Sequence, residues 1–284
     1  LFLTFLIQDV TVSLHSPLVL PSHTFLQILV YSPKFGHSHS NYMGRIADIL
    51  SEAGHDVSTI VSVIDPEVKD GTKLSKIIRV QPSEETSRLY SQFTAMNDEM
   101  FNMNTFDPIG AYFFGKLFST IFATQCRALL EEPGLVDSLR AEKFDVYLTE
   151  NFDMCGIGLS ELIKPRSLIS LSTSNAFGPQ LEEFPLHPAM IQVPLYLLSF
   201  QMDVNSMWDR IVNFYADFLV RMSFNQMRSA VHAVFKERFG SDFPTMEQIS
   251  SNSAYVFTNS EPLIDFAVPT MSKVKHLGST LCIL

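Results

Sequence analysis

One histidine of this sequence, His39, has the placement of a proton-transfer group. It follows a short apolar run at residues 25–31, which is typical of a buried parallel strand, and it precedes a stretch with helical spacing. Ligands of open α/β sheets bind at this carboxyl edge of the strands, and a helix amino terminus disfavours a protonated imidazole. A neutral His39 could therefore act as a general base. His37 is a rival for this role, and a packed or solvated histidine is the alternative to either.

Carboxylates that could pair with an imidazole follow a second expected strand. Glu150 comes at the end of the strand at residues 144–149, so it should emerge at the same edge of the sheet as His39. A carboxylate hydrogen-bonded to an imidazole fixes its tautomer and stabilises the imidazolium that forms on proton abstraction. Asp153 competes for this role, whereas Asp145 lies near the start of the strand and is expected to be structural. The alternative for Glu150 is a charge at a helix amino terminus.

Two glycines after the same strand imitate a dinucleotide-binding motif. Gly156 and Gly158 open an expected helix, but the third glycine position of the motif is Glu161. A carboxylate there would repel a pyrophosphate at the helix amino terminus. We therefore expect these glycines to serve close packing of a helix on the sheet, and a dinucleotide-dependent oxidoreductase is disfavoured.

No motif for a metal or for a phosphate-binding loop is present. The sequence lacks GxxxxGK[ST], GxSxG and HExxH. Its three cysteines, Cys126, Cys155 and Cys282, are too few and too scattered for a zinc site or a disulfide framework. We expect no metal and no bound cofactor in this chain.

Strand and helix patterns alternate along the chain and must bring these side chains together. Helical spacing begins after Ser40 or Asn41, either of which can cap a helix, and it ends at Gly54. Further helices are expected at 83–140, with breaks at 107–108 and 133–134, at 155–163 and at 208–239; strands are expected at 57–64, 76–80, 144–149, 167–172, 254–258 and 273–277. This order predicts the α/β class, with a Rossmann-like, doubly wound parallel sheet.

The composition favours a packed protein that does not bind nucleic acid. Of the 284 residues, 46% are hydrophobic, so the chain can bury a sizeable core. Lysine and arginine number 20 against 30 acidic residues, and this net charge of −10 disfavours contact with phosphate backbones. Phenylalanine occurs 24 times. The Phe-rich segment 100–122 and the apolar segment 191–200 could line an apolar pocket, although core packing is the alternative for any single phenylalanine.

The first residues have the character of a processed leader. The chain begins with Leu, and residues 1–7 (LFLTFLI) are apolar, so residues 1–24 are expected to be an N-terminal segment with a remnant of a signal peptide. The long uncharged stretches at 10–33 and 184–202 are interrupted by prolines. Neither is a clean run of about 20 apolar residues, so we expect no transmembrane helix in this chain.

Several ordered stretches together resemble a known family. Residues 28–57 (ILVYSPKFGHSHSNYMGRIADILSEAGHDV) resemble the opening of UDP-glycosyltransferases of the UDP-glucuronosyltransferase type, particularly the nematode branch. The likeness rests on Ser38-His39, on Met43 and on the Gly-His-Asp-Val sequence at 54–57, and later stretches that resemble the family lie at 144–155, 202–219 and 257–269. Such enzymes have two Rossmann-like lobes in the GT-B arrangement. The resemblance implies that residues 25–284 form the N-terminal, acceptor-binding lobe, without the C-terminal donor lobe and membrane anchor.

The same resemblance implies a function and roles for the site residues. His39 would be the catalytic base of an inverting transfer from a UDP-sugar (UDP-glucuronate or UDP-glucose, bound mainly by the absent lobe) to a hydroxyl of a small lipophilic acceptor. Glu150 falls where vertebrate members usually have Asp, so its side chain is one methylene longer, and Cys155 falls on a position expected to serve packing. The lobe would be inactive alone, and the whole protein would be a detoxifying enzyme on the lumenal side of the endoplasmic reticulum membrane; homo-oligomer formation stays open. The alternative is a non-catalytic one-lobe module that binds lipophiles or full-length relatives.

Overall fold

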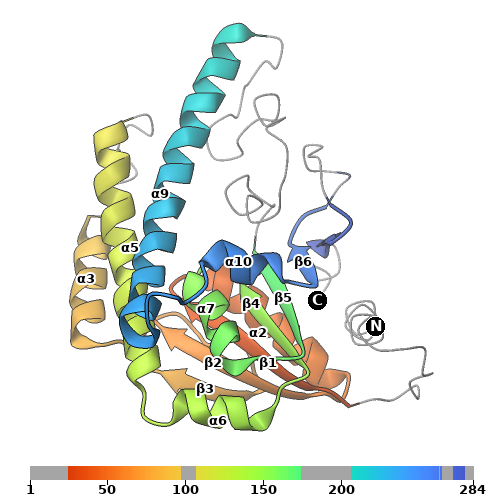
Figure 1. The fold of residues 1–284 in the computed structure, drawn as a ribbon. Coiled ribbons are helices and arrows are strands. Elements are labelled where there is room, and N and C mark those ends of the chain that lie inside the picture. The colour runs from red at the N-terminus through yellow and green to blue at the C-terminus, as the bar shows by residue number, and fades with distance from the viewer. Residues whose placement is uncertain (1–24, 97–106, 174–205, 262, 264–270, 279–284) are drawn as a thin grey trace.

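A parallel sheet forms the centre of the computed structural model, which describes residues 25–96, 107–173, 206–261, 263 and 271–278 (Figure 1). Within these residues the sheet has seven strands in the order β3-β2-β1-β4-β5-β6-β7, and all neighbours are parallel. The strands are β1 (Gln27–Lys34), β2 (Asp56–Val63), β3 (Lys76–Val80), β4 (Val146–Glu150), β5 (Ser167–Ser172), β6 (Tyr255–Thr258) and β7 (Val274–His276). The helices are α2 (His37–Glu52), α3 (Glu84–Ala95), α5 (Pro108–Glu131), α6 (Leu135–Glu142), α7 (Met154–Ile163), α9 (Met207–Phe239) and α10 (Met246–Ser251).

Both faces of the sheet are covered, as a doubly wound fold requires. Side chains of β1 alternate: Ile28 and Val30 pack in a core cluster with α2, whereas Leu29 and Tyr31 pack in a larger cluster with α5, α7 and α9. The strand order reverses between β1 and β4, which defines the topological switch point of the sheet. The predicted Rossmann-like, doubly wound parallel sheet is confirmed.

The start of α2 differs from the sequence expectation. The helix begins at His37 with Gly36 as its N-cap and without a capping side chain, rather than after Ser40 or Asn41. Strand β1 extends through Pro33, which was expected to lie in a loop. Proline is tolerated there because β4 pairs with β1 only over Ile28–Tyr31, so no β4 carbonyl needs the missing N–H. His39 therefore sits in the first helical turn.

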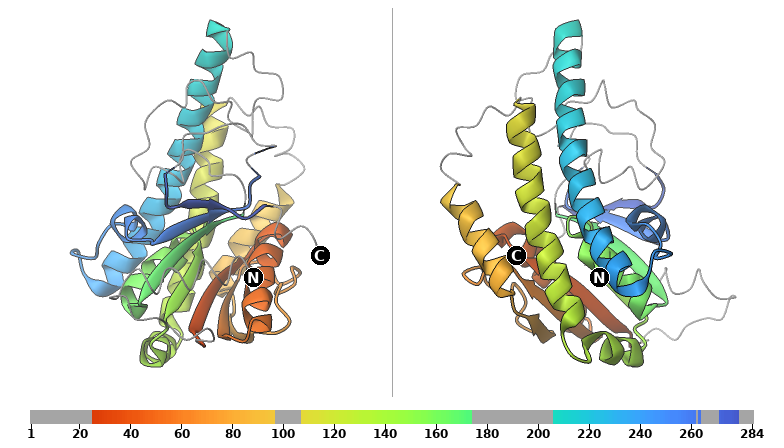
Figure 2. Two further views of the ribbon diagram at one scale, coloured as in Figure 1. Left: turned by 90° about the vertical axis from the view of Figure 1, so that its right-hand side faces the viewer. Right: turned by 60° about the vertical axis from the view of Figure 1, so that its left-hand side comes forward.

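Helices α5 and α9 run side by side, with their amino-terminal ends projecting beyond the sheet (Figures 1 and 2). The predicted break before α5 is confirmed, since Asp107 caps the helix by accepting hydrogen bonds from the N–H groups of Ile109 and Gly110. Gly115 lies at this close approach, where a Cβ would lie 3.2 Å from the Cα of Ser223 on α9. This pair of helices forms one wall of the space above the carboxyl edge of the sheet.

Helix α7 packs tightly on the strands, as its glycines predicted. A Cβ on Gly156 would lie 2.1 Å from Thr149 Oγ1, and one on Gly158 would lie 2.3 Å from the ring of Phe235. The sequence did not predict that Cys126 of α5 and Cys155 of α7 form a disulfide, which is a single bond and not a framework. Cys155 thus covalently joins two helices in addition to packing between them.

Three parts of the sequence for which we stated expectations lie outside the described residues. They are the N-terminal segment 1–24, the apolar segment 191–200 and Cys282. In the described part of the chain, no helix is both long and apolar enough to span a bilayer. Helix α10 was not among the predicted elements.

Candidate active site

His39 lies at the carboxyl edge of the sheet and is held by aromatic rings. Its ring centroid lies 4.2 Å from that of Phe35 and 5.1 Å from that of Phe152. The side chain is 16% exposed, so the imidazole is packed but still reachable from one side. A position after β1 and at the first turn of α2 confirms the predicted edge placement.

Glu150 lies beneath this imidazole. It is the last residue of β4 and is fully buried, and its Oε1 lies 2.5 Å from His39 Nδ1. A carboxylate accepts hydrogen bonds, so Nδ1 carries the proton and Nε2 is left with its lone pair. This is the tautomer that a histidine base needs, and the buried carboxylate can stabilise the imidazolium once Nε2 has taken a proton.

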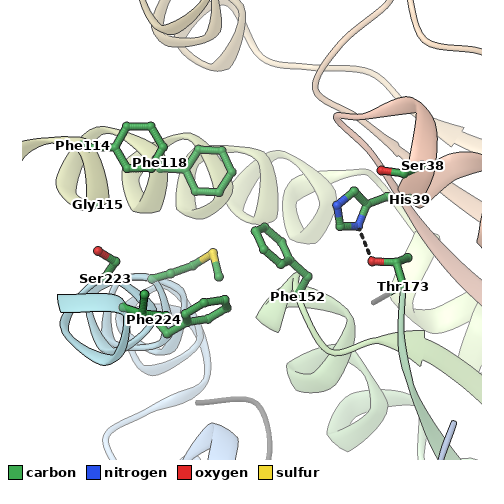
Figure 3. A pocket seen from close by; sticks show the side chains of 11 residues that line it. Ser38, His39, Phe114, Gly115, Phe118, Phe152, Thr173, Ser223 and Phe224 are labelled. Atoms are coloured by element: carbon green, nitrogen blue, oxygen red, sulfur yellow. Dashed lines mark hydrogen bonds between the residues drawn. The ribbon is translucent and has the colours of Figure 1, made fainter. Parts of the chain in front are cut away.

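Thr173 completes the contact between these two residues, and the sequence analysis did not single it out. It directly follows β5. Its hydroxyl donates to Glu150 Oε1 at 2.8 Å and lies 3.2 Å from His39 Nδ1 (Figure 3). The sequence did contain one indication of this placement. Thr173 follows a predicted strand, so it had to emerge at the same edge of the sheet as His39 and Glu150.

The two rival residues lie elsewhere. His37 is exposed in the first turn of α2. Asp153 is buried and turns inward, where it accepts a hydrogen bond from the Tyr31 hydroxyl at 2.7 Å and caps α7 through the N–H of Cys155. Burial raises the pKa of Asp153 from its usual 3.8 to about 6. The structure therefore pairs His39 with Glu150 and not with Asp153.

Two further titratable groups, Tyr42 and Asp145, are neutral or structural. Burial, with the charge of Glu150 adding to it, raises the pKa of Tyr42, so this phenol keeps its proton. Asp145 lies at the opposite end of β4, where it accepts from the N–H of Gln27 at 3.0 Å and pairs with Arg166, as its structural interpretation predicted. Among the described residues, no group of three or more His, Cys, Asp or Glu side chains could hold a metal ion.

A cavity of about 440 Å³ opens beside the imidazole. It lies between the amino-terminal half of α5, the middle of α9 and the carboxyl edge of the sheet (Figure 3). Its lining side chains are mostly aromatic or aliphatic, with a few hydroxyls and one imidazole: Ser38, His39, Phe114, Gly115, Phe118, Phe152, Thr173, Val220, Ser223, Phe224 and Met227. Phe114 and Phe118 of the Phe-rich segment 100–122 line this cavity as expected, whereas residues 100–106 lie outside the described residues. The arrangement suits an apolar molecule that places one polar group against His39.

Comparison with known proteins now identifies the family. A sequence model of the family described as "UDP-glucoronosyl and UDP-glucosyl transferase" matches residues 27–284. The chain belongs to this family, as its resemblance implied.

Its relatives are about twice as long. The chain is 28% identical over 258 residues to the putative UDP-glucuronosyltransferase ugt-47 of Caenorhabditis briggsae, which covers 88% of this chain and 46% of that protein. It is 29% identical over 255 residues to human UDP-glucuronosyltransferase 3A1, which covers 87% of this chain and 46% of the human protein. The chain thus spans about half the length of the curated relatives it matches.

Solved structures with a similar arrangement are remote in sequence. The calicheamicin glycosyltransferase CalG4 is 14% identical, with a TM-score of 0.48, over 90% of this chain and 52% of that one. The glycosyltransferase SnogD from Streptomyces nogalater is 13% identical, with a TM-score of 0.46, over 87% of this chain and 48% of that one.

Proposed function

We propose that residues 25–284 form the acceptor-binding N-terminal lobe of an inverting UDP-glycosyltransferase with the GT-B arrangement, in which His39 is the general base. The observation that carries this proposal is the His39–Glu150 pair at the mouth of an apolar cavity. Membership of the family supports a UDP-sugar as the donor. Because this chain spans about half of its relatives, we assign most of the donor contacts to the half that it does not contain.

The proposed chemistry follows from the protonation of the pair. Nε2 of His39 takes the proton of the acceptor hydroxyl while the hydroxyl oxygen attacks the anomeric carbon of the sugar. The bond from that carbon to the UDP oxygen breaks, UDP leaves with the bonding electrons, and attack from the opposite face inverts the configuration. Glu150 keeps Nδ1 protonated throughout and stabilises the imidazolium that forms.

The cavity supports a small lipophilic acceptor. Most of its lining is carbon, so burial of apolar acceptor surface supplies the binding energy, and the few hydroxyls and His39 can orient one polar group. The disulfide between Cys126 and Cys155 fits a protein that folds in an oxidising compartment. This supports the lumenal side of the endoplasmic reticulum membrane as its location, with membrane association of the whole protein.

A direct test compares the two neighbouring histidines. In this chain joined to the second half of a relative, His39→Ala is expected to lower the rate of sugar transfer by about 10²–10⁴, the usual contribution of general base catalysis. His37→Ala is the matched control and should retain the wild-type rate, because His37 is exposed and lies outside the cavity. Equal rates for wild type and His39→Ala would refute the proposal.

A one-lobe binding module is the second candidate, since the cavity is formed within this chain alone. Calorimetry on the 284-residue chain tests which ligands this chain binds by itself. Binding of a lipophilic phenol without binding of UDP agrees with either candidate, so the transfer assay decides between them. Tight binding of UDP to the isolated chain would contradict the assignment of the donor site to the other half.

A further inference from the structure

The threonine beside the imidazole is fixed by the sheet itself. Asn259, which follows β6, donates from its side chain to the Thr173 carbonyl at 3.1 Å and from its main chain to the Ser172 carbonyl at 3.0 Å. The main-chain bond to Ser172 continues the ladder between β5 and β6, and the side-chain bond holds the carbonyl of Thr173 beside it. Its hydroxyl is held at a set position relative to β4, whose last residue, Glu150, is in register with Leu171 of β5.

Three polar atoms form a closed triangle at this place, and Figure 3 shows the side between His39 and Thr173. Oε1 of Glu150 lies 2.5 Å from His39 Nδ1 and 2.8 Å from Thr173 Oγ1, and that hydroxyl lies 3.2 Å from the same Nδ1. The threonine has one hydroxyl proton, and it points to the carboxylate. Its oxygen lone pairs are then available to Nδ1–H, so both oxygens around Nδ1 require the proton to be on that nitrogen.

The carboxylate needs this second hydrogen bond. Oε2 of Glu150 is buried and has no hydrogen-bond partner among the described residues, so the group is anchored through Oε1 alone. A glutamate side chain has one more rotatable bond than an aspartate side chain. A buried carboxylate that loses its hydrogen bonds also lowers the stability of the folded protein. The Thr173 hydroxyl both satisfies Oε1 and restricts that extra torsion.

We propose that Thr173 is a positioning residue, whose hydroxyl holds the Glu150 carboxylate and keeps His39 in the tautomer protonated at Nδ1. The importance of this tautomer for catalysis rests on the proposed function, in which His39 is the base. The effect on the tautomer itself needs neither donor nor acceptor. Thr173 acts through Glu150 and His39, and no reacting atom needs to touch it.

The test uses a pair of variants that differ in the hydroxyl. Thr173→Val keeps the shape of the side chain and removes the hydroxyl, whereas Thr173→Ser keeps the hydroxyl. In the 284-residue chain with ¹⁵N-labelled histidine, NMR should show His39 protonated only at Nδ1 in wild type and Thr173→Ser. Thr173→Val should add a population protonated at Nε2. An unchanged His39 pattern in a folded Thr173→Val protein would overturn the inference; if the amide spectrum shows that this variant does not fold, Thr173→Ala is read in the same way.

Kinetics separate this inference from the proposed function. In the chain joined to a relative's second half, Thr173→Val should lower kcat about tenfold with little change in KM, as expected for one lost hydrogen bond to a charged group, and Thr173→Ser should restore it. If the tautomer shifts but His39→Ala leaves transfer unchanged, Thr173 positions the imidazole and the proposed function fails. If transfer needs His39 but Thr173→Val leaves both tautomer and kcat unchanged, the inference about Thr173 fails alone.

Discussion

Glu150 Oε1 lies 2.5 Å from Nδ1 of His39, although 111 positions separate the two residues in the chain. The contact follows from topology, because β1 and β4 are neighbours where the strand order reverses. His39 leaves the sheet after β1 and Glu150 ends β4, so both emerge at the crevice where such sheets bind ligands. The fold thus provides a buried carboxylate beneath a histidine that faces an apolar cavity.

Removing the charge of Glu150 should lower the transfer rate more than shortening its side chain does. Glu150→Gln keeps an oxygen that can accept from Nδ1–H, but it cannot stabilise an imidazolium, so we expect the transfer rate to fall about 10²-fold. Glu150→Asp retains the charge but places it one methylene further from His39. Its transfer rate should lie between those of Glu150→Gln and wild type. Steady-state kinetics with a phenolic acceptor measure both.

Asp153→Asn is the matched control for this comparison. It also neutralises a buried carboxyl, only three positions further along, but that carboxyl bonds to Tyr31 and to the N–H of Cys155. Its transfer rate should stay within about threefold of wild type. A larger loss for Asp153→Asn than for Glu150→Gln would show that the wrong carboxylate has been assigned to His39.

Narrowing the cavity should alter the size of acceptor that is accepted. Val220 of α9 lines the cavity, so Val220→Phe should raise KM for a bulky phenol about tenfold while leaving kcat for a small phenol nearly unchanged. Phe218 lies two positions away and is 55% exposed, so Phe218→Ala is the control and should change neither value. Equal effects of both substitutions on the bulky phenol would place its binding site elsewhere.

The buried Asp153 should leave a signature in the pH dependence of stability. Burial raises its pKa to about 6, so the native state binds this proton more tightly than the unfolded chain does. The stabilisation is fully present below about pH 4 and is lost as the pH rises through about 6. The free energy of unfolding of wild type, relative to that of Asp153→Asn, should therefore fall by about 1–2 kcal/mol between these pH values.

Denaturant unfolding at several pH values checks this prediction. Burial also raises the pKa of Asp217 to about 6, but both proteins contain that residue, so its effect cancels in the difference. A difference between the two proteins that does not vary with pH would contradict the burial of an ionisable Asp153.

The disulfide should stabilise the packing of α5 against α7. Cys126 and Cys155 lie 29 positions apart, and a closed loop of this size typically contributes about 2–4 kcal/mol. Cys126→Ser with Cys155→Ser should lower the free energy of unfolding by this amount, and reduction of wild type should do the same. Alkylation and mass spectrometry of the native protein provide the check, because two freely alkylated thiols at these positions would contradict the bond.

The fold could be predicted because buried parallel strands are short apolar runs, and the elements that carry His39 and Glu150 were found in this way. The start of α2 was missed, since Gly36 offers no capping side chain to mark it. The disulfide was missed for a different reason. Its cysteines lie on two helices that meet only in the folded chain, and their spacing matches no motif.

The site was predictable as an edge of the sheet but not as a set of contacts. The sequence left Glu150 and Asp153 as rivals, because their choice depends on how the chain turns after β4. That turn directs Asp153 inward to Tyr31 as the cap of α7. Thr173 was not singled out, since its role depends on a distance to His39 across the sheet and not on a neighbouring residue in the sequence.

The most direct test of the account compares acceptors of different acidity. A general base is needed for an alcohol, which keeps its proton at neutral pH, but not for a nitrophenol that is already ionised. In the chain joined to a relative's second half, His39→Ala should lower the rate of transfer to the alcohol about 10²–10⁴-fold and to the nitrophenolate far less. Equal losses for both acceptors, or no loss for the alcohol, would contradict the assignment of His39 as the base.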